Sequence, residues 1–173
     1  MLTLFRDAPC LQMTAAVTCE YETETREYEL VCHYEAEGTS VVTVTKPEEL
    51  SGLAIEFDGE KKTLRYGETC LDAPRLGDEG LSPAEVLPRL MDALRQGYLT
   101  EEGKEDFAGA EAWRITLAQE GKTGDILFTI WLSEEDGTPL AATVFDGEML
   151  NCKLVFTSFT FGDIMQEEET ALT

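Results

Sequence analysis

The chain has 173 residues, of which 43% are hydrophobic, and its 35 acidic and 13 basic residues give a formal net charge of -22. This length fits a single domain with one sizeable core, since domains commonly contain roughly 100–200 residues. The apolar content excludes the disordered acidic class. The charge argues against binding to DNA, RNA or an anionic lipid surface, which would repel the protein.

No apolar run reaches the roughly 18 residues that a membrane-spanning helix needs. The opening residues, MLTLFRDAPCLQM, lack the basic start, apolar stretch and small-residue cleavage site of a signal peptide. A cytoplasmic protein and a chain that begins after a removed targeting segment both fit these features. The amino-acid composition is compatible with both.

Alternating apolar and polar residues dominate the first third of the chain and predict an antiparallel meander. After an N-terminal segment, 1–13, we expect strands at 14–22 and 27–35, joined by the polar loop 23–26. A third strand, 40–47, ends at a proline, whose missing N–H cannot continue a ladder of hydrogen bonds.

Residues 50–67 predict a hairpin around the turn Asp58-Gly-Glu-Lys61, because Asp-Gly favours the tight turns of hairpins. One face of this hairpin is apolar. Its members are Leu53, Ile55, Phe57, Leu64 and Tyr66.

The spacing becomes helical in the middle of the chain and predicts a helix over 82–97. Ser82 and Glu85 match a capping box, Pro88 predicts a kink or restart, and Gly97 is placed to end the helix in a left-handed conformation. One stripe of this helix is apolar and suits packing against a sheet. It consists of Leu87, Leu90, Met91 and Leu94.

Alternation resumes after the helix and continues almost to the C-terminus. The expected strands are 109–120, 126–133, 140–146 and 150–162, and an acidic tail follows at 163–173. The whole pattern predicts a mainly β protein with some helix: one strongly curved antiparallel sheet of about eight to ten strands, covered on its concave face by the 82–97 helix.

Residues suited to catalysis are few. His33 is the only histidine, and as a strand neighbour of Cys32 it points to the opposite face, so the two cannot form a nucleophilic pair. The Gly-Lys-Thr sequence at 121–123 lacks the earlier glycine of a phosphate-binding loop, because Thr116 holds that position. We therefore expect no enzyme, no cofactor and no metal site.

The five cysteines show no Cys-x-x-Cys spacing, and their odd number leaves at least one outside any internal pair. A hairpin centred near Thr25 and Arg26 would place Cys19 opposite Cys32 on one face. Export would permit a disulfide between them, and a cytoplasmic location would keep both as buried thiols.

The C-terminal stretch WLSEEDGTPLAATVFDGEMLNCKLVFTSFTFG, following a long meander with one helical excursion, resembles the LolA/LolB-like lipoprotein carriers. In that family a late strand leads to an acidic-glycine turn and Pro-Leu, then to a strand, a turn and a final aromatic strand. The first half, MTAAVTCEYETETREYELVCHYEAEGTSVVTVTKPEELSGLAIEFDG, is similar to extracytoplasmic lipoproteins of Gram-positive, often spore-forming, bacteria.

The resemblance covers nearly the whole chain and implies one LolA-like domain, 1–173, built as an incomplete barrel with an interior able to accept acyl chains. It also implies an extracytoplasmic, membrane-anchored lipoprotein. The sequence departs from that pattern in having neither a signal peptide nor a lipid-attachment motif at Cys10, so the expected anchor lies upstream of Met1. We assign no residue of this sequence to the arginine that gates the carriers' cavity.

Two functions follow from this resemblance. The first is a non-enzymatic envelope lipoprotein that binds a lipid or a lipoprotein acyl chain in its half-barrel. The second is a structural or adaptor lipoprotein with a filled interior that binds an envelope protein. For each candidate residue of the first function, packing in an ordinary core is the alternative. The candidates to line a ligand site are Phe57, Leu64, Tyr66, Leu87, Leu90, Met91, Leu94, Trp113 and Ile115.

Overall fold

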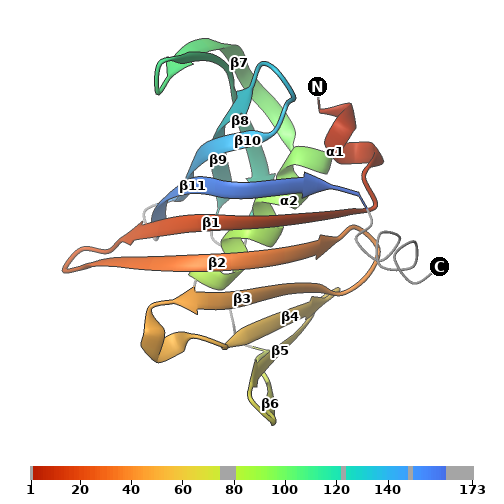
Figure 1. The fold of residues 1–173 in the computed structure, drawn as a ribbon, viewed down its shortest axis with the longest axis vertical. Coiled ribbons are helices and arrows are strands. Elements are labelled where there is room, and N and C mark those ends of the chain that lie inside the picture. The colour runs from red at the N-terminus through yellow and green to blue at the C-terminus, as the bar shows by residue number, and fades with distance from the viewer. Residues whose placement is uncertain (1, 75–80, 122–123, 148–149, 163–173) are drawn as a thin grey trace.

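The computed structural model describes residues 2–74, 81–121, 124–147 and 150–162. Its main feature is a single antiparallel sheet of eleven strands, in the order β6-β5-β4-β3-β2-β1-β11-β10-β9-β8-β7 (Figure 1). The outermost strands, β6 and β7, are not paired with each other, so the sheet is open. No helical segment in the described ranges has the length and apolar character that crossing a bilayer requires.

The strands are β1 (Cys10–Glu20), β2 (Thr25–Glu35), β3 (Ser40–Lys46), β4 (Ala54–Asp58), β5 (Lys61–Tyr66), β6 (Thr69–Asp72), β7 (Tyr98–Phe107), β8 (Ala110–Glu120), β9 (Asp125–Ser133), β10 (Pro139–Asp146) and β11 (Leu150–Phe161). The α-helices are α1 (Thr3–Asp7) and α2 (Val86–Gln96), and the short 3₁₀ helices are η1 (Glu48–Leu50) and η2 (Pro83–Glu85). Two of these strands, β6 and β7, raise the count above the eight to ten expected from the sequence.

The sheet curves around α2. This helix contacts β2 and β3 and also β8, although β1, β11, β10 and β9 lie between them in the sheet. In a flat sheet β2 and β8 would be roughly 24 Å apart, at about 4.8 Å per strand, which is wider than a helix. The sheet must therefore bend, as Figure 1 shows, with α2 on its concave side.

The core lies between this concave face and α2. Along β1, β9 and the C-terminal half of β2, buried residues alternate with more exposed ones, as expected for a sheet with one face on the core. Fully buried side chains come from the centre of the sheet and from the helix. The largest are Phe5, Leu11, Met13, Leu30, Leu87, Leu90, Met91, Leu94, Leu117, Phe128, Ile130 and Leu132.

The ends of α2 partly match the prediction. The carboxylate of Glu85 accepts a hydrogen bond from the Ser82 N–H, as in a capping box. Pro88 lies in the first turn of α2, where its missing N–H costs least. Gly97 is not left-handed, since its φ is -67° and its ψ 162°. Glycine is required there for space, because a Cβ would meet the carbonyl oxygen of Ala93.

The predicted disulfide between Cys19 and Cys32 is wrong. The turn of the first hairpin lies at residues 21–24, so Cys19 faces Arg26, six residues away from Cys32, and Cys32 faces Met13. Cys19 is bonded instead to Cys152 of β11, 133 residues later in the chain. The acidic tail expected at 163–173 lies outside the described residues.

Candidate functional site

The apolar stripe of α2 is buried in the core. Its side chains are at most 1% exposed, and none of them lines either of the two cavities described below. Four candidates of the sequence analysis, Leu87, Leu90, Met91 and Leu94, therefore hold the helix against the sheet. Two cavities lie at other places.

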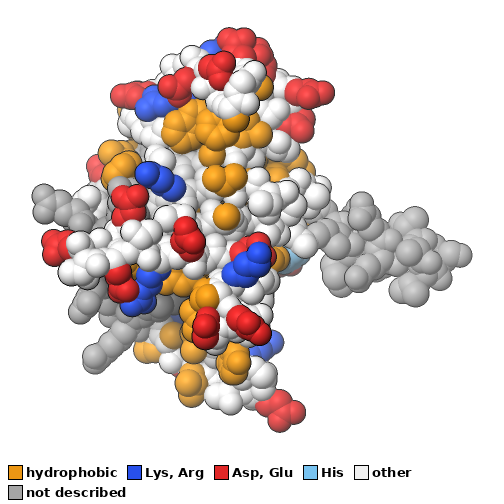
Figure 2. Space-filling model, turned by 60° about the vertical axis from the view of Figure 1, so that its left-hand side comes forward, with side chains coloured by type: hydrophobic (Ala, Val, Ile, Leu, Met, Phe, Trp, Pro, Cys, Tyr) orange, Lys and Arg blue, Asp and Glu red, His pale blue; other side chains and the backbone are white. Residues whose placement is uncertain are grey.

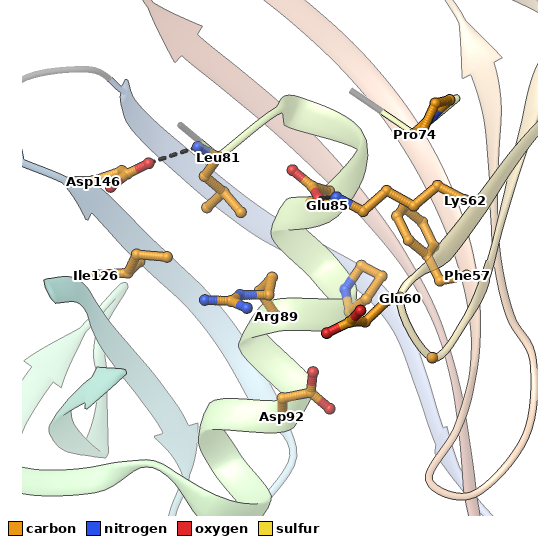
Figure 3. Close-up of a pocket in the computed structure, with 12 residues that line it drawn as sticks. Phe57, Glu60, Lys62, Pro74, Leu81, Glu85, Arg89, Asp92, Ile126 and Asp146 are labelled. Carbon is orange, nitrogen blue, oxygen red and sulfur yellow. Dashed lines mark hydrogen bonds and ion pairs between the residues drawn. The ribbon is translucent and has the colours of Figure 1, made fainter. Parts of the chain in front are cut away.

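The first space is a cavity of about 470 Å³ between α2 and the β4–β5 hairpin, which we call the α2 cavity (Figure 3). Phe57 and Lys62 come from the hairpin, and Pro88, Arg89 and Asp92 from the helix. The other lining residues are Gly59, Glu60, Pro74, Leu81, Glu85, Ile126 and Asp146. Charged groups thus share the wall with a few apolar side chains.

A buried ion pair forms part of that wall. The Nζ atom of Lys62 lies 2.6 Å from Oε1 of Glu85, and the two side chains are only 14% and 10% exposed. Figure 3 shows them pointing toward each other from the hairpin and from the start of the helical segment. Such a pair gains little net stability, because desolvation offsets the attraction, and it makes the wall polar.

Other residues that line the α2 cavity are also polar. Oδ2 of Asp146 accepts a hydrogen bond of 2.6 Å from the Leu81 N–H, and Arg89 donates to the carbonyl oxygen of Glu120 over 3.0 Å. Burial raises the pKa of the Asp92 carboxyl above its ordinary value. A hydrocarbon chain is therefore poorly matched to this cavity.

The second space is a depression of about 340 Å³ at the end of the concave face where β7, β8 and β9 lie, which we call the α1 groove. Its floor is apolar, from Leu99 of β7, Trp113 and Ile115 of β8, and Leu132 of β9. These side chains share a face because Trp113 pairs with Leu132 in the β8–β9 ladder. Leu2, Thr3 and Arg6, in and beside α1, form the opposite wall, and Glu102 completes the lining.

Charged groups are confined to the edges of the α1 groove. Lys104 on β7 lies 4.9 Å from the ring centre of Trp113, a distance that allows a cation–π contact. Arg6 donates from Nε to the carbonyl oxygen of Arg95. The floor suits an apolar group, and the edges suit the polar end of the same molecule.

The nine candidate residues therefore do not share one cavity. Trp113 and Ile115 lie in the α1 groove, and Phe57 lies in the α2 cavity. Leu64 is partly buried and Tyr66 is 56% exposed, and neither lines these two spaces. Two residues of the groove floor, Leu99 and Leu132, were not among the candidates named from the sequence. The register of the β8–β9 hairpin would have placed Leu132 opposite Trp113, but no sequence signal marks Leu99 as part of an exposed edge strand.

The structure separates His33 from its neighbour Cys32. His33 lies on the opposite face of β2 from the buried Cys32, and burial raises the pKa of that thiol. No group of three or more His, Cys, Asp or Glu residues in the described ranges could hold a metal ion.

No protein-family model matches the sequence, and no protein with curated annotation matches it. Solved structures do match its fold. A LolA superfamily protein from Nitrosomonas europaea aligns with a TM-score of 0.57 over 93% of this chain and 90% of that one, at 11% identity. An uncharacterized conserved protein from Thermus thermophilus gives 0.55 over 94% and 85%, at 14% identity.

A domain described as a putative outer membrane lipoprotein-sorting protein, from Vibrio parahaemolyticus, gives a TM-score of 0.52 at 9% identity, over 97% of this chain and 92% of that one. The fold is therefore LolA-like, as the sequence resemblance predicted. At these identities the likeness concerns the fold alone.

Proposed function

We propose that this protein is a non-enzymatic binding protein of the cell envelope that holds a hydrophobic ligand, a lipid or lipoprotein acyl chain, in the α1 groove. The observation that carries the proposal is the apolar floor formed by Leu99, Trp113, Ile115 and Leu132 beneath α1. Ligand sites commonly measure roughly 300–1,000 Å³ and combine apolar walls with a few polar groups. The α1 groove, at about 340 Å³, lies at the lower end of this range.

The size of the groove limits its affinity. A buried methylene contributes about 0.8 kcal/mol, so six of them give roughly 5 kcal/mol before the cost of association is subtracted. The groove as it stands suits the end of a chain, with weak binding. The net charge of -22 disfavours an anionic headgroup and leaves the chain as the recognised part.

The disulfide between Cys19 and Cys152 supports an extracytoplasmic location, because such bonds form and persist in oxidising compartments. Attachment to the membrane through a lipid anchor is part of this proposal. The resemblance of the sequence to lipoproteins of Gram-positive bacteria motivates it.

The adaptor function has one observation in its favour. Leu127 of β9 and Phe145 of β10 pair directly and are 42% and 43% exposed, on the face of the sheet opposite the core. Val155 of β11 is 54% exposed. On the side of the molecule drawn in Figure 2, hydrophobic side chains gather in one patch near the top and are elsewhere interspersed with acidic and basic ones. Nothing there commits the surface to one partner. We therefore place the adaptor function second.

The proposal can be tested by titrating delipidated protein with cis-parinaric acid, a fluorescent fatty acid, and displacing it with a neutral fatty alcohol. Leu99→Gln places a polar group on the groove floor and should weaken binding by roughly tenfold, the equivalent of about 1.4 kcal/mol. Tyr98→Gln is the matched control, because Tyr98 is the neighbouring residue on the same edge strand and is 76% exposed. Absence of saturable binding, or equal effects of the two substitutions, would favour the adaptor function.

A further inference from the structure

Helix α1 divides the end of the concave face into two parts. On one side Leu2, Thr3 and Arg6 line the open α1 groove. On the other side Phe5 is fully buried, with its ring centre 6.0 Å from that of Phe159 and 5.3 Å from that of Phe161, both on β11. One short helix thus has an empty apolar space beside it and a filled one beneath it.

Few polar contacts hold α1 in place. The Nη1 atom of Arg95, at the end of α2, donates hydrogen bonds of 2.5 and 2.7 Å to the carbonyl oxygens of Phe5 and Ala8. Arg6 returns a bond of 3.3 Å to the carbonyl oxygen of Arg95. Figure 1 shows α1 beside α2 at one end of the sheet, outside the ladder of strands. Its position therefore depends on the Phe5 side chain and on the hydrogen bonds of Arg95 and Arg6.

We propose that Phe5 occupies the inner part of the hydrophobic ligand site and sets the length of the chain that the site accepts. This inference rests on the proposed function and extends it. When a long chain binds, α1 moves away and Phe5 leaves its position against Phe159 and Phe161. The floor of the α1 groove then continues into the aromatic cluster of β11, whose third member is Phe156, in edge contact with Phe159.

Chain length decides whether this exchange is favourable. A short chain ends within the α1 groove and leaves Phe5 where it is. A longer chain brings enough methylenes to replace the apolar contacts of the Phe5 ring, and each further methylene adds to the gain. The aromatic cluster offers an apolar surface of the right kind, because the Phe5 ring already packs there against Phe159 and Phe161.

The test compares 1-octanol with 1-dodecanol as competitors of cis-parinaric acid, whose own affinity is first measured for each variant. Phe5→Ala removes the internal occupant, so the affinity for 1-dodecanol should rise by about fivefold or more while that for 1-octanol changes by less than about twofold. Leu4→Ala is the matched control on the same helix, since Leu4 is 46% exposed. It should change neither affinity.

Hydrogen exchange of the wild-type protein provides a second readout that does not require the Phe5 variant to fold. Amides of α1 should exchange faster with bound 1-dodecanol than with bound 1-octanol. If the wild type binds both alcohols, but Phe5→Ala leaves their ratio unchanged and α1 exchange is the same with each, the inference about Phe5 is overturned and the proposed function stands. If neither alcohol binds the wild type, the proposed function itself fails.

Discussion

The hydroxyl group of Tyr34 on β2 donates a hydrogen bond of 2.6 Å to the carboxylate of Asp92 on α2, and so joins the covering helix to the sheet. Burial raises the pKa of Asp92, and the bond from Tyr34 and the charges of Arg89 and Arg95 only partly oppose this shift. Burial likewise raises the pKa of Tyr34. The contact therefore places an ionisable group where its charged form is disfavoured.

This contact predicts a specific pH dependence of stability. Between the ordinary carboxyl pKa and the raised pKa of Asp92, the folded state holds more protons than the unfolded state. The contribution of Asp92 to the free energy of unfolding therefore falls as pH rises through that window. Asp92→Asn cannot ionise, so its urea midpoint minus that of the wild type should increase with pH across the acidic range.

The exposed Asp58 provides the control for the loss of one carboxylate from an acidic protein, through Asp58→Asn. The urea midpoint of Asp58→Asn minus that of the wild type should not show the increase with pH that is expected for Asp92→Asn. A flat difference for Asp92→Asn over the acidic range would show that the raised pKa does not contribute to stability.

The cysteines give a second prediction. Cys19 and Cys152 are fully buried and bonded, with Cα atoms 4.3 Å apart, and the remaining cysteines are the buried Cys10 and Cys32 and the exposed Cys70. Alkylation of the unreduced protein should modify Cys70 alone in the folded state and Cys10, Cys32 and Cys70 after denaturation. Mass spectrometry of the labelled peptides measures this directly. Reduction combined with denaturation is the control and should expose all five thiols.

Loss of the bridge should also destabilise the protein. Replacing Cys19 and Cys152 by alanine together should lower the free energy of unfolding by roughly 2–5 kcal/mol, as for other native disulfides. Five labelled thiols in the unreduced, denatured protein would contradict the pairing and remove this support for an extracytoplasmic location.

A third prediction concerns two glycines in ordinary backbone conformations. Gly97→Ala should destabilise the protein by more than about 1 kcal/mol, because its Cβ would meet the carbonyl oxygen of Ala93 at the end of α2. Gly103→Ala, on β7, should change stability by less than about 0.5 kcal/mol, because nothing lies within 4 Å of a Cβ there. Chemical unfolding of both variants checks this, and equal effects would mean that the helix end can relax.

Local patterns in the sequence were sufficient to predict most of the sheet and the helix. Alternation in the segments of β1, β2, β8 and β9 follows from one buried face, and the stripe from Leu87 to Leu94 follows from packing on the sheet. The edge strand β7 could not be found in this way. Almost all of its residues are exposed, on both faces of the sheet, so they show no alternation of apolar and polar side chains. The short β6 is exposed throughout and was missed for the same reason.

The candidate site was harder to predict, because it depends on contacts between distant segments. The pairing of β1 with β11 brings Cys19 to Cys152, and no local signal encodes that register. The α1 groove needs a helix at the start of the chain above strands that begin at Tyr98 and Ala110. Apolar residues such as Trp113 can be named from alternation, but the sequence does not show which of them border free space.

The central claim is that an apolar chain binds at the α1 end of the concave face. The most direct test is to saturate the delipidated protein with an eight-carbon fatty alcohol, short enough to end within the α1 groove, that carries a photoreactive diazirine near the chain end. The sample is then irradiated, and the modified residues are mapped by peptide mass spectrometry. We predict labelling at Leu99, Trp113, Ile115 and Leu132, reduced by excess 1-dodecanol. Labelling concentrated at Phe57 and Ile126 in the α2 cavity, or scattered over the outer face without competition, would contradict it.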